Sequence, residues 1–468
     1  MNEPGLPGGQ CVSVCGFWSH RVRHMLAGVY FATQSEEPIR KWLCSSLTPA
    51  AVGRIPVRPY NGEVRYGILA DDLTGSCDAA GRLTRLGYRP LVVARSGTAR
   101  RILSALPEEA AVVVMNTRSR DCSLREAVAR ARAAAEELER CGVPVIYQKI
   151  DSTLRGHWAE ELKAVRAVTR PQHVLVCPAF PAQGRLVRDG RLHLRRAERE
   201  GLLHTTGAAS AHSVRTILRQ RCGWDTPEVR LESVRGGARA ISQALEEHDG
   251  APCVIVDATR ERDLDTIGQA FRHSPARLLW VGSAGLVRTV LPPLPRAEAA
   301  PEAQSEGSWL LIQGSRQPLS HTQFQRLGVE PAIDLVDFSP GRERNQRRRW
   351  LNAALGTLSS GRDVAVAVPR AYDRRVPAEF VAFLDKLLLK ILAAPRLGGI
   401  FVTGGNTADA VCDSLRITTL RVTAEIRPGI ARSRALDGRR PGLRLVTKAG
   451  GFGKADEVRQ VLQRCRRA

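Results

Sequence analysis

The chain is poor in lysine, poor in aromatic residues and free of long apolar runs. Only seven of its 70 basic residues are lysines, and aromatic residues make up 5% of its 468 positions. No apolar run approaches the ~20 residues that a membrane helix needs, so we expect no membrane span. A formal charge of +23 suggests a nucleic-acid partner, but the arginine excess is spread along the chain with few aromatics beside it. We therefore expect no nucleic-acid binding and keep it as the weakest of three functional hypotheses.

Several sequence signatures are missing as well. The eleven cysteines include no C-x-x-C pair, which argues against a disulfide framework and a zinc site. Cys77, Cys177, Cys253 and Cys412 fall in segments that we expect to be buried. Thiols used in this way are typical of a reducing compartment, and we expect a cytoplasmic protein. Neither G-x-x-x-x-G-K-[ST] nor G-x-G-x-x-G is present, which disfavours a P-loop ATPase and a conventional Rossmann dehydrogenase.

Composition divides the chain into four segments. Residues 1–62 show little periodicity and are expected to be a poorly ordered N-terminal extension, with a transit peptide as the alternative. An α/β pattern covers residues 63–291, a linker rich in Pro, Ala, Glu and Ser covers 292–307, and a second α/β pattern covers 308–468. We expect an α/β fold with two α/β domains, largely parallel sheets and an active-site cleft between the domains.

Short apolar runs bounded by polar turns predict the strands, and 3.6-residue periodicity predicts the helices. The predicted strands are 65–70, 90–94, 111–115, 143–147, 173–177, 252–257 and 278–281 in the first half, and 309–312, 332–336, 364–368, 400–403, 420–424 and 443–447 in the second. Helices are predicted after residues 75 and 123 and over 157–168, 320–327, 378–392 and 407–415. The segment 188–207, rich in Arg, Gly and His, matches neither pattern.

The most informative stretch is the loop Lys149-Ile150-Asp151-Ser152-Thr153-Leu154-Arg155-Gly156, between a predicted strand and a predicted helix. Such loops lie at the carboxyl edge of a parallel sheet, where ligands bind. In a chain that strongly prefers arginine, Lys149 suggests a need for a compact point charge. The alternative is a charged surface loop with an internal Asp151–Arg155 ion pair. We interpret the loop as a binding element for a small polyhydroxylated anion.

A second polar cluster follows the first strand. Carboxylates at strand ends can hold sugar hydroxyls, bind Mg²⁺ through water or accept a proton from an attacking hydroxyl. Asp72 and Asp151 are the candidate catalytic residues, as general base or hydroxyl positioner, while helix N-capping is the alternative role of Asp72 or Thr74. Arginines suit carboxylate clamps because a guanidinium pairs with a carboxylate bidentately. The candidate substrate-binding residues are Asp71, Thr74, Lys149, Ser152, Arg155 and Arg185.

Three small-residue loops follow predicted strands in the second half. Glycines there let the backbone approach a ligand, and free N–H groups at a helix start attract phosphate. Ordinary tight turns and an exposed loop lysine are the alternatives. The candidate phosphate-binding residues are Ser315, Gly404, Gly405, Asn406, Thr407, Lys448, Gly450 and Gly451, and no metal ligand is assigned.

Together these motifs resemble the four-carbon acid sugar kinase family, whose members phosphorylate threonate, erythronate or 3-oxo-tetronate with ATP. The resemblance runs in family order from about residue 64 to 455 and rests on the following motifs: Ala70-Asp71-Asp72-Leu73-Thr74-Gly75, the Lys149 to Gly156 loop, Pro178-Ala179-Phe180-Pro181 with Gly184-Arg185, Gly282-Ser283-Ala284-Gly285-Leu286, Gly314-Ser315, Gly404-Gly405-Asn406-Thr407, Pro428-Gly429 and Lys448-Ala449-Gly450-Gly451-Phe452-Gly453. It implies an ATP- and Mg²⁺-dependent kinase whose first domain binds the sugar acid and whose second binds ATP.

The chain departs from the family pattern in three places. Asn406 stands where the family has Asp or Glu, Arg316-Gln317 interrupts the usual Gly-Ser-x-Ser loop, and the usual Asp-Pro segment after Arg185 is missing. The first two departures favour the second hypothesis, a non-catalytic protein that binds the sugar acid but has lost nucleotide chemistry. The sequence leaves open which four-carbon acid and which hydroxyl are used, and whether the chain forms a homo-oligomer.

Overall fold

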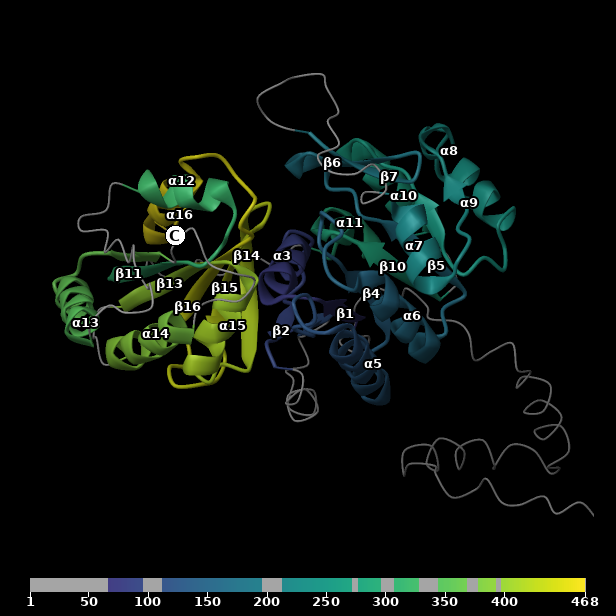
Figure 1. Cartoon of the computed structure of the whole chain (residues 1–468). Helices are drawn as coiled ribbons and strands as arrows, with labels where there is room; N and C mark the ends of the chain where they lie inside the picture. Colours follow the sequence, from purple (N-terminus) through teal and green to yellow (C-terminus); the bar gives the residue numbers. More distant parts are fainter. Residues whose placement is uncertain are drawn as a thin grey trace, which may run out of the picture. The chain divides into compact units, whose positions relative to one another are not determined.

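The computed structural model of the chain describes residues 66–95, 112–195, 213–271, 277–295, 307–327, 344–367, 378–392 and 397–467. These residues form an α/β fold built around one large sheet (Figure 1), which confirms the expected fold class. The expected N-terminal extension, most of the expected linker and the predicted strand 332–336 lie outside the described residues. Within the described ranges, no helix combines the length and apolar character that crossing a membrane would require.

The first half contributes parallel strands with helices on both faces of the sheet. Its strands are β1 (Tyr66–Ala70), β2 (Leu91–Val93), β3 (Val112–Asn116), β4 (Val145–Lys149), β5 (His173–Cys177), β8 (Glu228–Val229), β9 (Val254–Val256) and β10 (Leu278–Gly282). Its helices are α3 (Leu73–Thr84), α5 (Leu124–Arg140), α6 (Trp158–Thr169), α7 (Val214–Cys222), α8 (Leu231–Arg235), α9 (Ala238–Glu246), α10 (Glu261–Phe271) and α11 (Ala284–Val290). Every residue of β1 and β3 is buried, as expected for parallel strands that helices cover on both faces.

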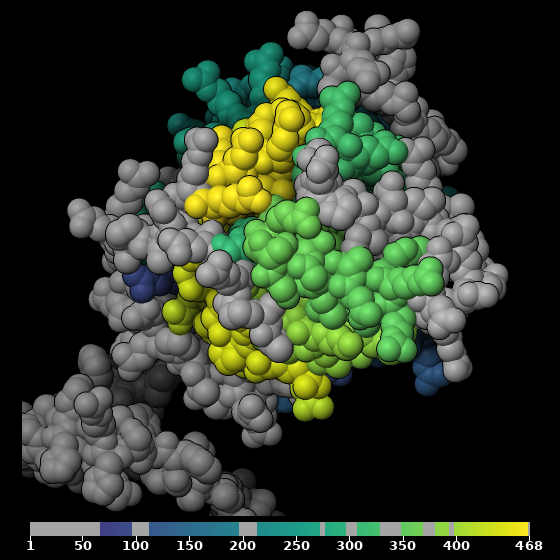
Figure 2. All heavy atoms as spheres, turned by 90° about the vertical axis from the view of Figure 1, so that its left-hand side faces the viewer, coloured from purple at the N-terminus to yellow at the C-terminus, as the bar shows by residue number. Residues whose placement is uncertain are grey.

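The second half combines parallel strands with an antiparallel hairpin. Its strands are β11 (Ser308–Gln313), β12 (Val364–Ala367), β13 (Leu397–Thr403), β14 (Thr419–Arg427), β15 (Ile430–Ala435) and β16 (Arg444–Lys448). Its helices are α12 (Pro318–Gln325), α13 (Arg344–Ser359), α14 (Ala378–Ile391), α15 (Gly405–Ser414) and α16 (Glu457–Arg467). Figure 1 shows α13, α14 and α15 on one face of these strands and α12 and α16 on the other. The face seen in Figure 2 is formed mainly by this half, in green and yellow.

An antiparallel hairpin joins the two sets of parallel strands. The strand order in the described residues is β12-β11-β13-β16-β15-β14-β2-β3-β1-β4-β10-β5-β9-β8. β15 pairs antiparallel with both β14 and β16, and the start of β14 pairs antiparallel with β2 through Thr419 to Arg421. The β14–β15 hairpin also packs on α3, where Gly81 lies against Ala431. Because of these contacts, α3 is held between the first-half strands and the second-half hairpin.

Local sequence signals account for several element boundaries. The predicted capping box opens α5: the Ser123 hydroxyl accepts the Glu126 N–H, and the Glu126 carboxylate accepts the Ser123 N–H at 3.1 Å. The predicted apolar stripe of α6 is buried through Trp158, Leu162 and Val165. The segment that matched neither pattern overlaps a separate antiparallel hairpin, β6 (Arg185–Arg188) and β7 (Arg191–Leu194). That hairpin was missed because each strand has only four residues, and the first, Arg-Leu-Val-Arg, does not alternate between apolar and polar residues.

The contact between α3 and β14 generates a stability prediction. Arg82 Nε lies 3.0 Å from Glu425 Oε1, and both side chains are almost completely buried. Replacing Glu425 by alanine leaves a buried guanidinium unpaired, which should lower the free energy of unfolding by about 3 kcal/mol. Arg85 also pairs with Glu425, at 3.2 Å, but its side chain is 68% exposed. The matched control Arg85→Ala should therefore cost less than about 1 kcal/mol. Urea titrations of both variants make the comparison, and equal losses would contradict it.

Candidate active site

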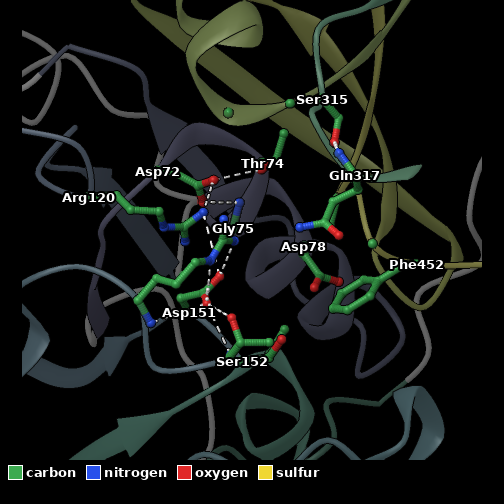
Figure 3. Close-up of a pocket in the computed structure, with 18 of the residues that line it drawn as sticks. Asp72, Thr74, Gly75, Asp78, Arg120, Asp151, Ser152, Ser315, Gln317 and Phe452 are labelled. Atoms are coloured by element: carbon green, nitrogen blue, oxygen red, sulfur yellow. Dashed lines mark hydrogen bonds and ion pairs between the residues drawn. The ribbon is translucent and has the colours of Figure 1, made fainter. Parts of the chain in front are cut away.

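A cavity of about 620 Å³ is lined by residues from both halves of the chain (Figure 3). The first half contributes the loop after β1, the start of α3 and the loop after β4. The second half contributes the loops after β11, β13 and β16. These are carboxyl ends of parallel strands, which is where α/β folds place ligands.

Most of the residues singled out in the sequence line this cavity. They are Asp72, Thr74, Lys149, Asp151, Ser152, Arg155 and Arg185 from the first half, and Ser315, Gly404, Gly405, Asn406, Gly450 and Gly451 from the second. Asp71, Thr407 and Lys448 are buried and are not among the lining residues. Direct ligand contact by these three stays a prediction.

The centre of the site is Arg120, which sequence reasoning missed. Its guanidinium donates to both oxygens of Asp71 at 2.7 Å and to Asp72 Oδ2, and it lies 3.8 Å from Asp151 Oδ1 (Figure 3). All three carboxylates are at most 6% exposed. One guanidinium thus supplies the positive charge that lets three buried carboxylates lie together.

Backbone contacts between β1 and the loop after β3 position Arg120. The Asp71 carbonyl accepts the N–H of Ser119 at 3.0 Å and that of Arg120 at 3.2 Å. β3 runs parallel to β1, so the polar residues after both strands meet at the same edge of the sheet. The rule that identified Asp71 and Asp151 as strand-end residues could have found Arg120, which follows β3 in the same way.

Asp72 combines a structural role with its place in the cavity. It is the N-cap of α3: Oδ1 accepts the Gly75 N–H at 2.7 Å, and Oδ2 accepts the Thr74 hydroxyl at 2.9 Å. Burial would raise its pKa, but Arg120 and Lys149 outweigh burial and lower it below its usual value. The N-capping role that the sequence left as an alternative is therefore present. A side chain at position 405 would clash with Asp72. Only a glycine there lets the second-half loop lie this close to the carboxylate.

The Lys149 to Gly156 loop folds around Asp151. Arg155 donates to both Asp151 oxygens at 3.0 and 2.7 Å, and the Thr153 N–H donates at 3.0 Å. Burial would raise the pKa of Asp151, but Arg120 and Arg155 hold it well below its usual range. Leu154 has a φ of 63°, an uncommon left-handed conformation for leucine, which this network sustains. The internal Asp151–Arg155 ion pair that the sequence suggested is formed, and it lines the cavity.

Two other cations of the cavity have no carboxylate partner among the described residues. Lys149 Nζ donates only to the Ile150 carbonyl, at 2.8 Å, although it lies close enough to lower the pKa of Asp72. Arg185 donates to the Gln183 carbonyl and stacks 4.8 Å from the centre of the Phe452 ring. Arg185 Nε is buried without a hydrogen-bond partner, and burial lowers the Arg185 pKa. Both charges are therefore available to an anion in the cavity.

On the opposite side, the Gly450-Gly451 loop presents backbone N–H groups. Lys448 is completely buried and donates to the carbonyls of Ala449 at 3.0 Å and Gly450 at 3.2 Å, which excludes the exposed loop lysine considered above. Ser320 also donates to the Gly450 carbonyl, at 2.7 Å. In the described residues the N–H groups of Gly450 and Gly451 have no partner. A loop whose carbonyls point inward and whose N–H groups are free is suited to an anion. Burial lowers the Lys448 pKa to about 7.

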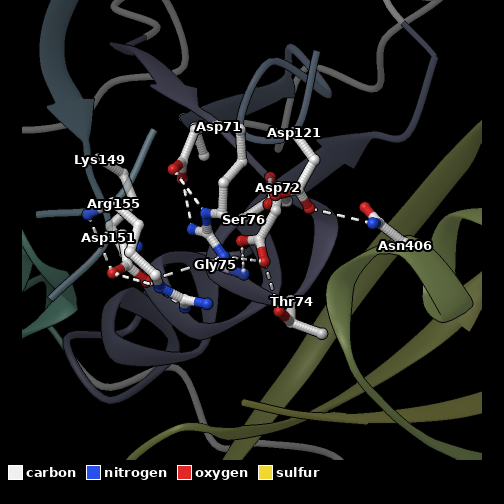
Figure 4. A network of polar contacts seen from close by, with 12 residues as sticks. Asp71, Asp72, Thr74, Gly75, Ser76, Asp121, Lys149, Asp151, Arg155 and Asn406 are labelled. Carbon is white, nitrogen blue, oxygen red and sulfur yellow. Dashed lines mark hydrogen bonds and ion pairs between the residues drawn. The ribbon is translucent and has the colours of Figure 1, made fainter. Parts of the chain in front are cut away.

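A contact between the halves crosses the cavity at Asn406. Its amide nitrogen donates to Asp121 Oδ2 at 3.0 Å (Figure 4). Asp121 is exposed and lacks an ion-pair partner among the described residues, unlike Asp72 and Asp151. No group of three or more His, Cys, Asp or Glu residues in the described ranges could hold a metal ion.

The Arg120 network generates a prediction with a defined pH dependence. Asp72 and Asp151 have pKa values lowered by folding, so their ionised forms stabilise the protein above pH about 4, and this contribution is lost as pH falls through the lowered pKa values. Arg120→Met should reduce the free energy of unfolding at pH 7 by about 3 kcal/mol or more. The loss should shrink towards pH 3.

Denaturant titrations at several pH values measure this effect. The control is Arg316→Met, since Arg316 also lines the cavity but is exposed. It should change stability by less than about 0.5 kcal/mol at any pH. A pH-independent loss in Arg120→Met would show that packing, and not the charge network, explains the effect.

Comparison with known proteins assigns the two halves separately. Residues 66–290 match the model of a sugar-binding N-terminal domain, and residues 310–458 match that of a nucleotide-binding C-terminal domain. Two solved structures, from Salmonella typhimurium and Haemophilus influenzae, share the fold at 20% identity, with TM-scores of 0.65 and 0.59. Each match covers 85% of this chain, and 98% and 99% of the solved chains respectively.

Curated relatives match along most of the chain. The D-threonate kinase of Bordetella bronchiseptica is 29% identical over 86% of this chain and 97% of its own length. That of Cupriavidus necator is 30% identical, over 82% and 94%. The 3-oxo-tetronate kinase of Cupriavidus necator is 28% identical, over 85% and 96%. With both domain models matched in order and these relatives aligned over nearly their whole length, the chain belongs to the four-carbon acid sugar kinase family.

Proposed function

We propose that the protein transfers the γ-phosphoryl group of ATP to a hydroxyl of a four-carbon sugar acid such as threonate, erythronate or 3-oxo-tetronate. The observation that carries this proposal is the composition of the cavity. Carboxylates and unpaired cations lie on its first-half side, and glycine loops with free N–H groups lie on its second-half side. The activities named for the relatives support the same reaction class.

The first-half side suits a small hydroxy acid. Lys149 and Arg185, which lack carboxylate partners, would bind the substrate carboxylate. Ser152 and Thr74 line the cavity with hydroxyls, and Asp72 and Asp151 line it with ionised carboxylates that can accept from substrate hydroxyls. Since both carboxylates are held by arginines, they are rigid acceptors that fix the orientation of the acid.

The second-half side suits the phosphates of ATP. Gly450 and Gly451 offer free N–H groups, and the start of α15 at Gly405 and Asn406 adds the unpaired N–H groups of a helix N-terminus. Lys448 would act indirectly, since its ammonium fixes the carbonyls of the loop and leaves the N–H groups facing the nucleotide. Catalysis would then consist mainly of positioning and charge neutralisation.

Mg²⁺ would be held together with the nucleotide. This ion usually binds phosphate oxygens and water with one or two protein carboxylates, and it does not need a dedicated cage. Asp121, whose other oxygen lacks a partner in the described residues, and the Asn406 amide oxygen beside it fit that requirement. When bound, the ion would neutralise charge on the phosphates.

A panel assay tests the proposed function. Purified protein with MgATP is offered D- and L-threonate, D- and L-erythronate and the 3-oxo-tetronates, and ADP release is followed. Substrate-dependent ADP from one acid is the expected result. If no acid of the panel causes ADP release but calorimetry shows that ATP binds, the substrate is a different acid. If there is neither ADP release nor ATP binding, the result favours the non-catalytic binding protein that Asn406 and Arg316-Gln317 suggested. Salt-dependent retention on DNA would favour a nucleic-acid binder.

Arg185 generates a prediction about substrate affinity. Removing a charged hydrogen-bond donor from a bound carboxylate costs about 1.5 to 3 kcal/mol. Arg185→Met should therefore lower kcat/KM for the sugar acid about 10- to 100-fold by raising KM, with little change in the KM for ATP. The matched control is Arg188→Met at the exposed end of the same strand, β6, which should leave both constants within about twofold. Steady-state kinetics with either substrate varied would show whether the loss falls on the acid.

A further inference from the structure

A third carboxylate of the cavity, Asp78, differs from Asp72 and Asp151 in its contacts. It lies on α3, lines the cavity and is 4% exposed (Figure 3). Its Oδ1 accepts the N–H of Gly429 at 2.9 Å. Within the described part of the chain, Oδ2 has neither a hydrogen-bond partner nor an ion-pair partner. Asp78 therefore keeps one acceptor oxygen for a ligand.

Asp72 and Asp151 have no oxygen that is free of protein partners. Both oxygens of each accept hydrogen bonds from protein groups, and each carboxylate is paired with a guanidinium. These contacts lower the pKa of both carboxylates, which makes them weak bases. A carboxylate held in this way orients a hydroxyl well but removes its proton poorly.

Burial and the charges around Asp78 bring the pKa of its carboxyl group close to neutral pH. Burial has the largest effect and raises its pKa to about 6. Arg82, one turn further along α3, and Lys149, at the end of β4, act in the opposite direction, while Glu425 of β14 raises the pKa. Arg82 is itself paired with Glu425, so no guanidinium is bound to Asp78. A carboxylate is most effective as a general base when the pKa of its carboxyl group lies near the working pH.

Asp78 is also tied to the phosphate-binding loop. Gly429, which donates to it, has a φ of 85°, and a side chain there would clash with the ring of Phe452. The Gly429 carbonyl accepts the Ala449 N–H at 2.9 Å. Through Gly429 the carboxylate is thus linked to the loop that contains Gly450 and Gly451. Asp78 therefore lines the cavity from the first half and is joined through Gly429 to its glycine-rich second-half side.

We propose that Asp78 is the general base of the phosphoryl transfer, an inference that rests on the proposed function. Asp78 Oδ2 takes the proton of the acceptor hydroxyl. The hydroxyl oxygen of the acid forms a bond to the γ-phosphorus at the same time. The bond from the γ-phosphorus to the β–γ bridging oxygen breaks, and its electron pair leaves with ADP. Asp72 and Asp151 then orient the acid, and Asp78 is the catalytic residue that receives the proton.

Asp78→Asn tests this assignment, because asparagine can still accept from the Gly429 N–H but cannot take a proton. We expect kcat to fall about 10²- to 10⁴-fold with little change in the affinity for ATP, and Asp78→Glu to recover part of the loss. The matched control is Asp257→Asn. Asp257 is a buried carboxylate with a raised pKa that also accepts backbone N–H groups, from Asp189 and Gly190, but it does not line the cavity. The kcat of the Asp257→Asn protein should stay within about threefold of the wild-type value.

The pH profile of the wild-type protein provides a readout that does not depend on a variant folding. The rate should decline towards acid with a midpoint near pH 6, and this decline should be absent from the residual activity of Asp78→Asn. A wild-type protein that is active but shows no such decline between about pH 5 and 8, or an Asp78→Asn protein within tenfold of wild type, overturns the base assignment alone. A wild-type protein that releases no ADP with any acid overturns the proposed function, and the base assignment with it.

Discussion

The arrangement of this site depends on one guanidinium. Three carboxylates that are each at most 6% exposed would repel one another and be costly to bury, and Arg120 contacts all three. Because the Asp71 carbonyl holds the backbone of the Arg120 loop, the charge is supplied from a fixed position and not by a mobile surface side chain. The loop after β4 and the start of α3 can therefore lie against each other.

This charge balance divides the polar residues of the cavity into two groups. Asp72, Asp151 and Arg155 form ion pairs within the protein, and these pairs make a rigid frame. Lys149 and Arg185 have no carboxylate partner in the described ranges, and Asp78 keeps one free oxygen. A sugar acid and a nucleotide need groups of the second kind, while the first kind keeps those groups in place.

The two halves are held together by secondary structure as well as by side chains. The β14–β15 hairpin pairs with β2 and β16 and packs on α3, so the sheet continues from one half to the other. Gly429 at the tip of that hairpin reaches Asp78, and Asn406 reaches Asp121. The contacts that bring the glycine loops to the first-half side of the cavity therefore come from the same elements that form the fold.

Much of the fold and part of the site followed from local pattern. The α/β class, most described strands, the capping box at Ser123 and the polar loops after β1 and β4 could be predicted because each depends on a few consecutive residues. The β6–β7 hairpin was missed because its strands have only four residues each, which is too short for a clear period. Sequence motifs also singled out Ser315, Gly405 and Gly450, and the structure places all three at the surface of the cavity.

The sequence by itself determined which loops line the cavity, and only the tertiary structure decided which partners each side chain in them has. Arg120 and Asp71 are 49 positions apart, and Asp78 and Gly429 are 351 apart. Whether a carboxylate is neutralised, left with a free oxygen or buried behind the cavity depends on such partners. Lys448 shows the same limit: its position close to Gly450 and Gly451 suggested a cation that contacts phosphate, but the side chain is buried and donates to the carbonyls of that loop. Charge and burial are properties of the surroundings, and the surroundings of these residues are assembled from distant parts of the chain.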